Sequence, residues 1–176
     1  MTIPNFITIA RLILVPIIVF MIGQGEWLAA FAIFIAAGVS DAVDGILAKR
    51  FGMASELGAY LDPIADKALI VSIYVSLAII GAIPSWVAIL VFSRDIMIVS
   101  AVILSWLLEN PVAIAPLIVS KANTLAQISF AALVLGARAF GIDLGVWTVV
   151  AESIVAVLTV ASMGAYLTLW LKHMAA

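Results

Sequence analysis

The chain has 176 residues, of which 66% are hydrophobic and 10% are charged, and its mean hydropathy is +1.33. A water-soluble domain needs many more polar residues to cover its surface, so this composition excludes an ordinary soluble protein and indicates a chain surrounded by lipid. The formal net charge of -2 and the eight scattered Lys and Arg residues exclude the basic patch on which nucleic-acid binding depends.

Apolar runs predict six membrane helices, in chain order near residues 5–22, 27–48, 59–81, 85–107, 118–137 and 145–171. A helix needs roughly 20 apolar residues to cross a bilayer, and each run has about that length. Short breaks rich in Gly, Pro, Asn and charge separate the runs. We therefore predict an all-α integral membrane protein, a bundle of six transmembrane helices that forms a single domain over residues 1–176. The first run lacks the features of a signal peptide, so we expect it to remain as a helix.

Basic residues gather at one end of the predicted helices, at Lys49, Arg50, Lys121 and Lys172. Among basic residues the opposite loops carry only Arg138, which Asp143 offsets. Short cytoplasmic loops are enriched in Lys and Arg, so both termini are predicted on the cytoplasmic side. We expect the bacterial inner membrane, with the matrix side of the mitochondrial inner membrane as the alternative.

Four aspartates lie at the ends of two neighbouring apolar runs: Asp41, Asp44, Asp62 and Asp66. The members of each pair are three or four residues apart, so each pair falls on one helix face. Ionised carboxylates at membrane depth are unfavourable without a compensating partner. Something must therefore neutralise these four charges.

Two interpretations of the aspartates differ in that partner. A salt-bridge network could form at the membrane edge with the nearby residues Lys49, Arg50 and Lys67. Divalent cations could instead bridge the carboxylates, which as hard oxygen ligands select Mg²⁺, Mn²⁺ or Ca²⁺. The chain has no cysteine, so thiolate metal sites are excluded. We favour a site for two metal ions, whose usual chemistry is in-line displacement at phosphorus.

The spacing around the aspartates resembles the signature of the CDP-alcohol phosphatidyltransferase family: Asp41-x-x-Asp44-Gly45-x-x-Ala48-Lys49, then Gly58, Asp62 and Asp66 at the family intervals. The resemblance extends to Pro4-Asn5-x-x-Thr8-x-x-Arg11 in the first run. Lys49 departs from the arginine that is usual in the family. A lysine cannot copy the guanidinium fork, so a bidentate role at this position is in doubt.

The resemblance implies an enzyme of phospholipid biosynthesis, in which CDP-diacylglycerol donates its phosphatidyl group to an alcohol and CMP is released. It implies that Asp41, Asp44 and Asp62 hold two divalent ions, Mg²⁺ or Mn²⁺, and that Asp66 ligates the second ion or acts as the catalytic base. Ca²⁺ could take their place in a structure. The family also implies a homodimer.

Nucleotide-binding residues are implied by the same match, at Asn5, Thr8, Asp41, Gly45, Ala48, Lys49 and Gly58. Two of them have a structural alternative. Thr8 could be a helix hydroxyl bonded to the backbone, and Asn5 a helix N-cap.

Two further charged positions are candidates for binding the acceptor or its phosphate. Arg94 lies with Asp95 inside the fourth apolar run, and Lys121 lies near the start of the fifth. The alternatives are that Arg94 locks the helix bundle and that Lys121 is only a topology signal.

The choice of acceptor separates two groups within the family. Cardiolipin synthases of the CMP-forming type use phosphatidylglycerol, whereas phosphatidylglycerophosphate synthases use glycerol 3-phosphate. The segments 57–67, 93–97 and 120–124 are more similar to the first group. The second typically has a lysine at the position of Asn123, and a phosphate monoester calls for more cationic donors than a lipid phosphodiester. We therefore favour the transfer to phosphatidylglycerol, which gives cardiolipin.

A small membrane transporter and a purely structural scaffold are the alternatives from other classes. A transporter usually shows paired repeats and helix breaks at the membrane midplane, and neither is found here. A scaffold gives no reason for four carboxylates in register. Metal-dependent binding of CDP-diacylglycerol or CMP would distinguish the enzyme from both.

Overall fold

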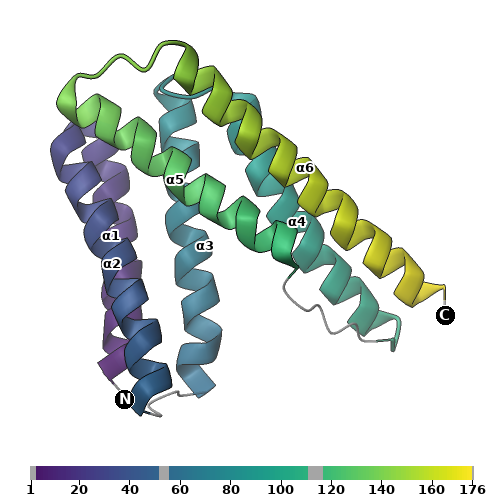
Figure 1. Cartoon of the computed structure of the whole chain (residues 1–176). Helices are drawn as coiled ribbons and strands as arrows, with labels where there is room; N and C mark the ends of the chain where they lie inside the picture. The colour runs from purple at the N-terminus through teal and green to yellow at the C-terminus, as the bar shows by residue number, and fades with distance from the viewer. Residues whose placement is uncertain (1–2, 52–55, 111–116, 176) are drawn as a thin grey trace. The chain divides into compact units, whose positions relative to one another are not determined.

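The structure, a computed structural model, describes residues 3–51, 56–110 and 117–175, and places the side chains of residues 7–41, 43, 64–110 and 117–175. This part of the chain contains six helices and no strand (Figure 1). The helices are α1 (Ile3–Gln24), α2 (Trp27–Phe51), α3 (Glu56–Ile79), α4 (Ser85–Leu107), α5 (Ile118–Phe140) and α6 (Val146–Met174). All six predicted helices are confirmed, each with boundaries within a few residues of the prediction.

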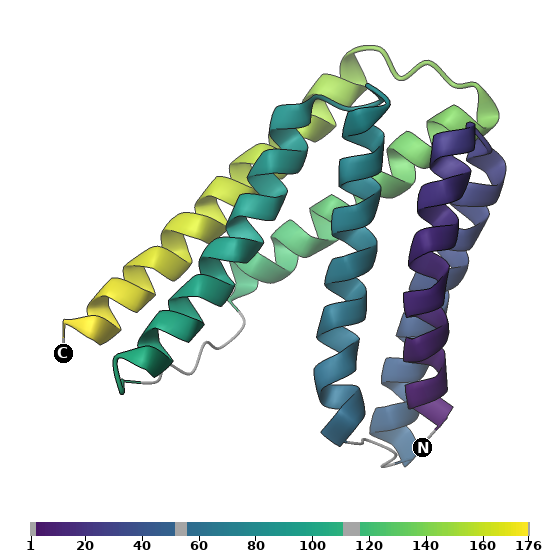
Figure 2. The same ribbon diagram turned by 180° about the vertical axis from the view of Figure 1, so that it is seen from behind.

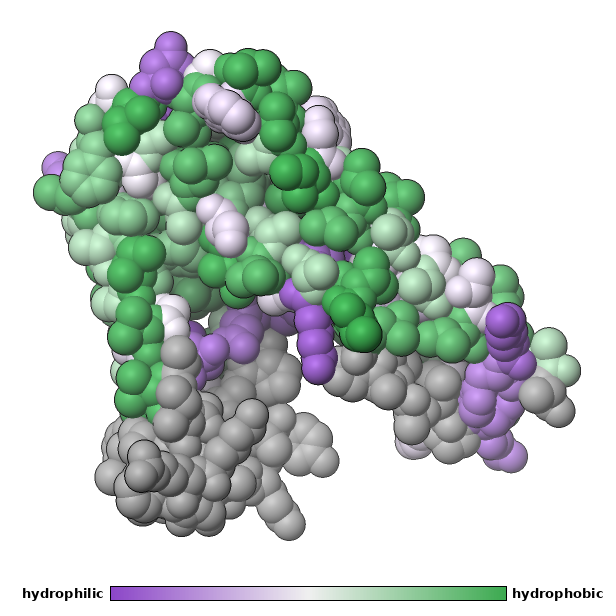
Figure 3. Space-filling view, in the orientation of Figure 1, coloured by the Kyte–Doolittle hydropathy of each residue, from purple (hydrophilic) through white to green (hydrophobic). Residues whose placement is uncertain are grey.

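Four of these helices are long and apolar enough to cross a membrane within the described residues: Ile7–Gln24, Ser85–Leu107, Ile118–Phe140 and Val146–Met174. In α2 the described apolar stretch is the shorter Trp27–Asp41. Large apolar side chains cover the outer faces of the helices, and hydrophobic residues dominate the face seen in Figure 3. Such a surface is stable in lipid and would aggregate in water. The protein is therefore an all-α membrane protein.

The chain forms two compact units, and α5 contributes to both. The first unit contains α1, α2, α3 and the part of α5 from Ala131 onward. Within it, α1 packs against both α2 and α3, as Figures 1 and 2 show from opposite sides. Ala30 and Ala37 of α2 are fully buried, and residues this small let helix backbones approach closely. Ile18 and Ile22 of α1 are buried one turn apart.

The second unit contains α4, α6 and the part of α5 up to Phe130. Here α4 and α6 pack side by side, with Val87 and Val91 of α4 and Val155 of α6 buried. Trp170 of α6 adds a polar link, since its Nε1 donates to the carbonyl oxygen of Ala101 at 3.1 Å and to Oγ of Ser105 at 2.7 Å. Polar bonds between helices of this kind hold membrane bundles together where lipid gives no hydrophobic drive.

A tight turn joins α1 to α2 through Gly25 and Glu26. Gly25 has a φ of 76°, its N–H donates to the carbonyl of Ile22, and the N–H of Glu26 donates to the carbonyl of Met21. This pattern is the Schellman motif, which ends a helix at a residue in the left-handed conformation that glycine adopts without strain. Gly81 ends α3 in the same way. The sequence signal for both ends was the glycine that follows each apolar run.

Candidate active site

A cation and two carboxylates from three different helices meet in the first unit. Nη1 of Arg11 on α1 lies 2.7 Å from Oδ1 of Asp41 on α2. The same nitrogen also donates a hydrogen bond to Oδ1 of Asp66 on α3. One guanidinium nitrogen therefore joins the first and last aspartates of the sequence signature, which are 25 residues apart in the chain.

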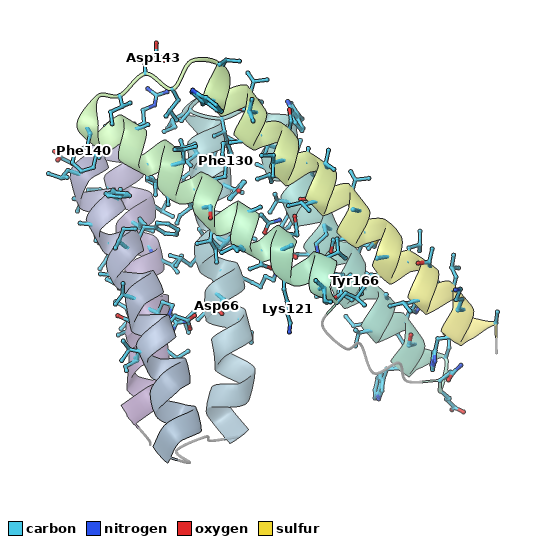
Figure 4. The ribbon with its side chains drawn as sticks, in the orientation of Figure 1. Asp66, Lys121, Phe130, Phe140, Asp143 and Tyr166 are labelled. Carbon is cyan, nitrogen blue, oxygen red and sulfur yellow. The ribbon has the colours of Figure 1, made fainter. Side chains whose placement is uncertain are left out.

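The three side chains differ in their access to the surroundings. The Arg11 side chain is 1% exposed, whereas the Asp41 and Asp66 side chains are 47% and 50% exposed. Figure 4 shows Asp66 on α3, about midway along the helix. The carboxylates thus contact a buried cation, while about half of the surface of each side chain is exposed.

The remaining candidates in this region lie outside the described side chains. They are the proposed metal ligands Asp44 and Asp62 and the proposed nucleotide contacts Asn5, Gly45, Ala48, Lys49 and Gly58. Their backbones belong to the described helices α1, α2 and α3.

Thr8 of α1 is the one nucleotide candidate besides Asp41 whose side chain is described. It is fully buried and lies one turn before Arg11 on the same helix face. Its hydroxyl therefore does not reach the surface, and both the nucleotide contact and the backbone-bonded alternative stay predictions.

The two described carboxylates fit a divalent metal ion by their chemistry and their convergence. Both present hard oxygen donors, both are half exposed, and both come within reach of one nitrogen atom. Among the described residues no group of three or more His, Cys, Asp or Glu side chains is gathered. The side chains of Asp44 and Asp62 lie outside these residues.

In the second unit a buried arginine forms its own polar network. Arg94 of α4 is 4% exposed, and its Nη1 pairs with Oδ1 of Asp95 at 2.7 Å. Its Nε and Nη2 donate to Oγ of Ser162 on α6 at 3.2 Å and 3.1 Å, and Nη2 also donates to Oγ of Ser120 on α5. The Tyr166 ring completes the surroundings, with its centroid 5.6 Å from Cζ. Arg94 thus joins three helices, as the bundle-locking interpretation expects.

Lys121 follows the Ser120 that Arg94 contacts, and its side chain is exposed. Figure 4 shows it extending away from α5. Two positions further on, Asn123 is fully buried, and its Oδ1 accepts a hydrogen bond of 2.9 Å from Thr159 on α6. Among the described residues at the start of α5, Lys121 is the one exposed cation, and the neighbouring amide of Asn123 is bonded inside the protein.

A sequence model of the CDP-alcohol phosphatidyltransferases matches residues 1–170, which is nearly the whole chain and includes all four aspartates. The chain belongs to the CDP-alcohol phosphatidyltransferase family. The family match crosses both compact units, so the second unit is part of the family architecture and not an appendage.

Relatives within the CDP-alcohol phosphatidyltransferases carry two different names. A probable phosphatidylglycerophosphate synthase of Mycobacterium tuberculosis is 42% identical over 98 residues, which are 52% of this chain and 47% of the relative. The human cardiolipin synthase (CMP-forming) is 32% identical over 181 aligned residues, 94% of this chain and 60% of the relative. A probable cardiolipin synthase (CMP-forming) of Drosophila melanogaster is 33% identical over 153 residues, 78% of this chain and 48% of the relative. The chain spans about half the length of the curated relatives it matches.

One residue at the centre of this candidate site carried only a weak signal in the sequence. Arg11 was part of the resemblance at the start of the chain, but no role followed from it there. The usable signal was an arginine on the same face of an apolar helix as Ile18 and Ile22, because an intramembrane cation requires a partner.

Proposed function

We propose that the protein transfers a phosphatidyl group from CDP-diacylglycerol to phosphatidylglycerol and releases CMP, which makes cardiolipin. The observation that carries this proposal is the convergence of Asp41 and Asp66 on one nitrogen of Arg11. It joins the two halves of the family signature from separate helices, and carboxylate oxygens that converge in this way suit a pyrophosphate-binding metal site.

Asp41, Asp44, Asp62 and Asp66 would hold two divalent ions, Mg²⁺ or Mn²⁺. When bound, such ions supply positive charge next to the pyrophosphate and the departing CMP. Asp66 would take the proton of the acceptor hydroxyl, and its half-exposed side chain makes it accessible to that hydroxyl. The nucleotide would lie against α1, α2 and α3, along the positions that the family match assigns to it.

Lys121 would contact a phosphate of the acceptor. It is exposed and cationic, whereas Arg94 already donates to three side chains and would position the turn of α5 that carries Lys121. The buried amide of Asn123 adds no further cation. One cation suits the phosphodiester of a lipid acceptor better than the doubly charged phosphate of glycerol 3-phosphate.

The synthesis of phosphatidylglycerophosphate from glycerol 3-phosphate is the second candidate. The 42% identity to the mycobacterial relative favours it, while the wider coverage by the human and fly relatives favours cardiolipin synthesis. For either reaction we propose a homodimer in the membrane, with both termini and the active site at the cytoplasmic or matrix face, where CMP can leave into water.

The deciding experiment measures CMP release by the purified protein from CDP-diacylglycerol and Mn²⁺, with phosphatidylglycerol and glycerol 3-phosphate supplied separately. We expect release with phosphatidylglycerol, and loss of release when EDTA removes the metal. Release only with glycerol 3-phosphate would establish the second candidate. Release with neither acceptor would refute both.

A further inference from the structure

Arg11 is a buried charge in an apolar helix, where an unpaired guanidinium would be strongly unfavourable. It is 1% exposed and lies on the face of α1 that also buries Ile18 and Ile22, at intervals of seven and four residues. An apolar side chain on this face would pack without any desolvation penalty, whereas a buried guanidinium is tolerated only when it is paired.

A single atom of Arg11, Nη1, makes both of its described ion pairs. Nη1 contacts Oδ1 of Asp41 and Oδ1 of Asp66, while the buried Nε and Nη2 have no hydrogen-bond partner among the residues whose side chains are described. In that part of the chain, Arg11 therefore contributes polar contacts only to these two carboxylates.

The two carboxylates in turn need a cation between them. Asp41 and Asp66 come from different helices, and two carboxylates brought to a common point repel each other. Arg11 offsets this repulsion from the buried side, through one oxygen of each carboxylate.

We propose that Arg11 is a positioning residue, which holds Asp41 and Asp66 in place whether or not a divalent ion is bound. This inference rests on the proposed function, because it concerns the carboxylates assigned there to the metal. A divalent ion held by these carboxylates would also neutralise them. The contribution of Arg11 to stability is therefore largest when the metal has been removed.

The test compares the thermal unfolding temperature of detergent-purified variants in EDTA and in Mn²⁺. R11M should lower Tm in EDTA by about 5 °C or more, and Mn²⁺ should recover most of that loss. The Tm of R11K in EDTA should lie between those of wild type and R11M. A single nitrogen of Arg11 makes both contacts, and a lysine also has one charged nitrogen. R138M is the matched control, since Arg138 lies in the same unit with its Cζ 5.6 Å from the centre of the Trp27 ring, and its effect should be equal in both conditions.

If Mn²⁺ stabilises the wild-type protein, a loss of Tm in R11M that is the same in EDTA and in Mn²⁺ would show a purely structural arginine and overturn the proposal. A double-mutant cycle of R11M and D66N in EDTA gives a readout that needs no metal. We expect strong coupling, with the double variant more stable than the sum of the single effects. If R11M alone fails to fold, recovery of a folded protein in the R11M/D66N double variant gives the same result. Additive effects would overturn the positioning role. Strong coupling without any response of the wild-type protein to Mn²⁺ would retain that role and refute the metal site of the proposed function.

Discussion

Thr159 of α6 donates a hydrogen bond of 2.9 Å to Oδ1 of Asn123 on α5, and both side chains are fully buried. This contact fixes the start of α5 against α6 within the second unit, two residues from the proposed phosphate ligand Lys121. The same two helices are also joined through Arg94, whose guanidinium contacts both Ser120 and Ser162.

The Asn123–Thr159 bond should be measurable as a coupling energy. In a double-mutant cycle of N123A and T159V, we expect the two residues to be coupled by roughly 0.6 kcal/mol, and by at most about 1.7 kcal/mol, the range found for polar bonds between membrane helices. Reversible unfolding in mixed detergent micelles would provide the four free energies of unfolding. Additive single effects would mean that the bond does not contribute to stability.

Replacing the proposed base should separate turnover from binding. D66N should lower the rate of CMP release by about 10²-fold to 10⁴-fold, because an amide cannot accept the proton of the acceptor hydroxyl. Its oxygen can still accept a hydrogen bond from Arg11, so the variant should fold and bind CDP-diacylglycerol. E26Q, in the exposed turn between α1 and α2, is the control and should retain full activity. Normal turnover in D66N would refute the assignment of the base.

Removal of the Lys121 charge should raise the KM for the acceptor and leave the stability of the protein unchanged. K121A should raise the KM for phosphatidylglycerol about tenfold or more, the effect of losing one hydrogen bond to a charged group. Because Lys121 is exposed, the Tm of this variant should stay at the wild-type value. K172A, at the exposed end of α6, removes an equal charge far along the chain and should leave KM unchanged. Equal effects of the two variants would indicate nonspecific attraction to anionic lipid.

Truncation of Arg94, unlike that of Lys121, should lower the free energy of unfolding. R94A leaves Asp95, Ser120 and Ser162 without their shared donor, and we expect the free energy of unfolding to fall by about 3–5 kcal/mol, as for other broken buried ion pairs. Unfolding in mixed micelles measures this loss. A variant of normal stability with a raised KM for the acceptor would instead establish Arg94 as the phosphate ligand.

A packing prediction concerns the contact between Gly136 of α5 and Phe31 of α2 in the first unit. A Cβ at Gly136 would lie 3.3 Å from the Phe31 ring, which in turn packs edge-on against Phe140, with 5.9 Å between ring centroids. G136L should therefore destabilise the protein by about 1–3 kcal/mol. G38L is the size-matched control, because a Cβ at Gly38 meets no atom within 4 Å. Equal stability of the two variants would contradict this packing.

Hydrophobic runs and glycine punctuation predict all six helices of this chain, because a membrane helix satisfies its own backbone hydrogen bonds and needs only length and apolar character. The family signature includes Asp41 and Asp66, the two aspartates that contact Arg11, while the roles of all four aspartates stay predictions. The sequence pattern does not show which residues a buried charge will contact. Arg11 and Arg94 are each one cation in an apolar run, yet one contacts two carboxylates and the other contacts two serines, an aspartate and a tyrosine ring. Only the packing of helices separates these two cases.

The two-residue connection through Gly25 and Glu26 has a consequence for biosynthesis. With so short a turn, α1 and α2 emerge from the ribosome almost together and can enter the bilayer as one helical hairpin. On that route the charges of Arg11 and Asp41 would enter the lipid as an ion pair, which would reduce the penalty of inserting either charge alone. Asp66 follows with α3 and meets an arginine that is already in the membrane. Lengthening this turn should therefore impair insertion of the nascent chain before it affects catalysis.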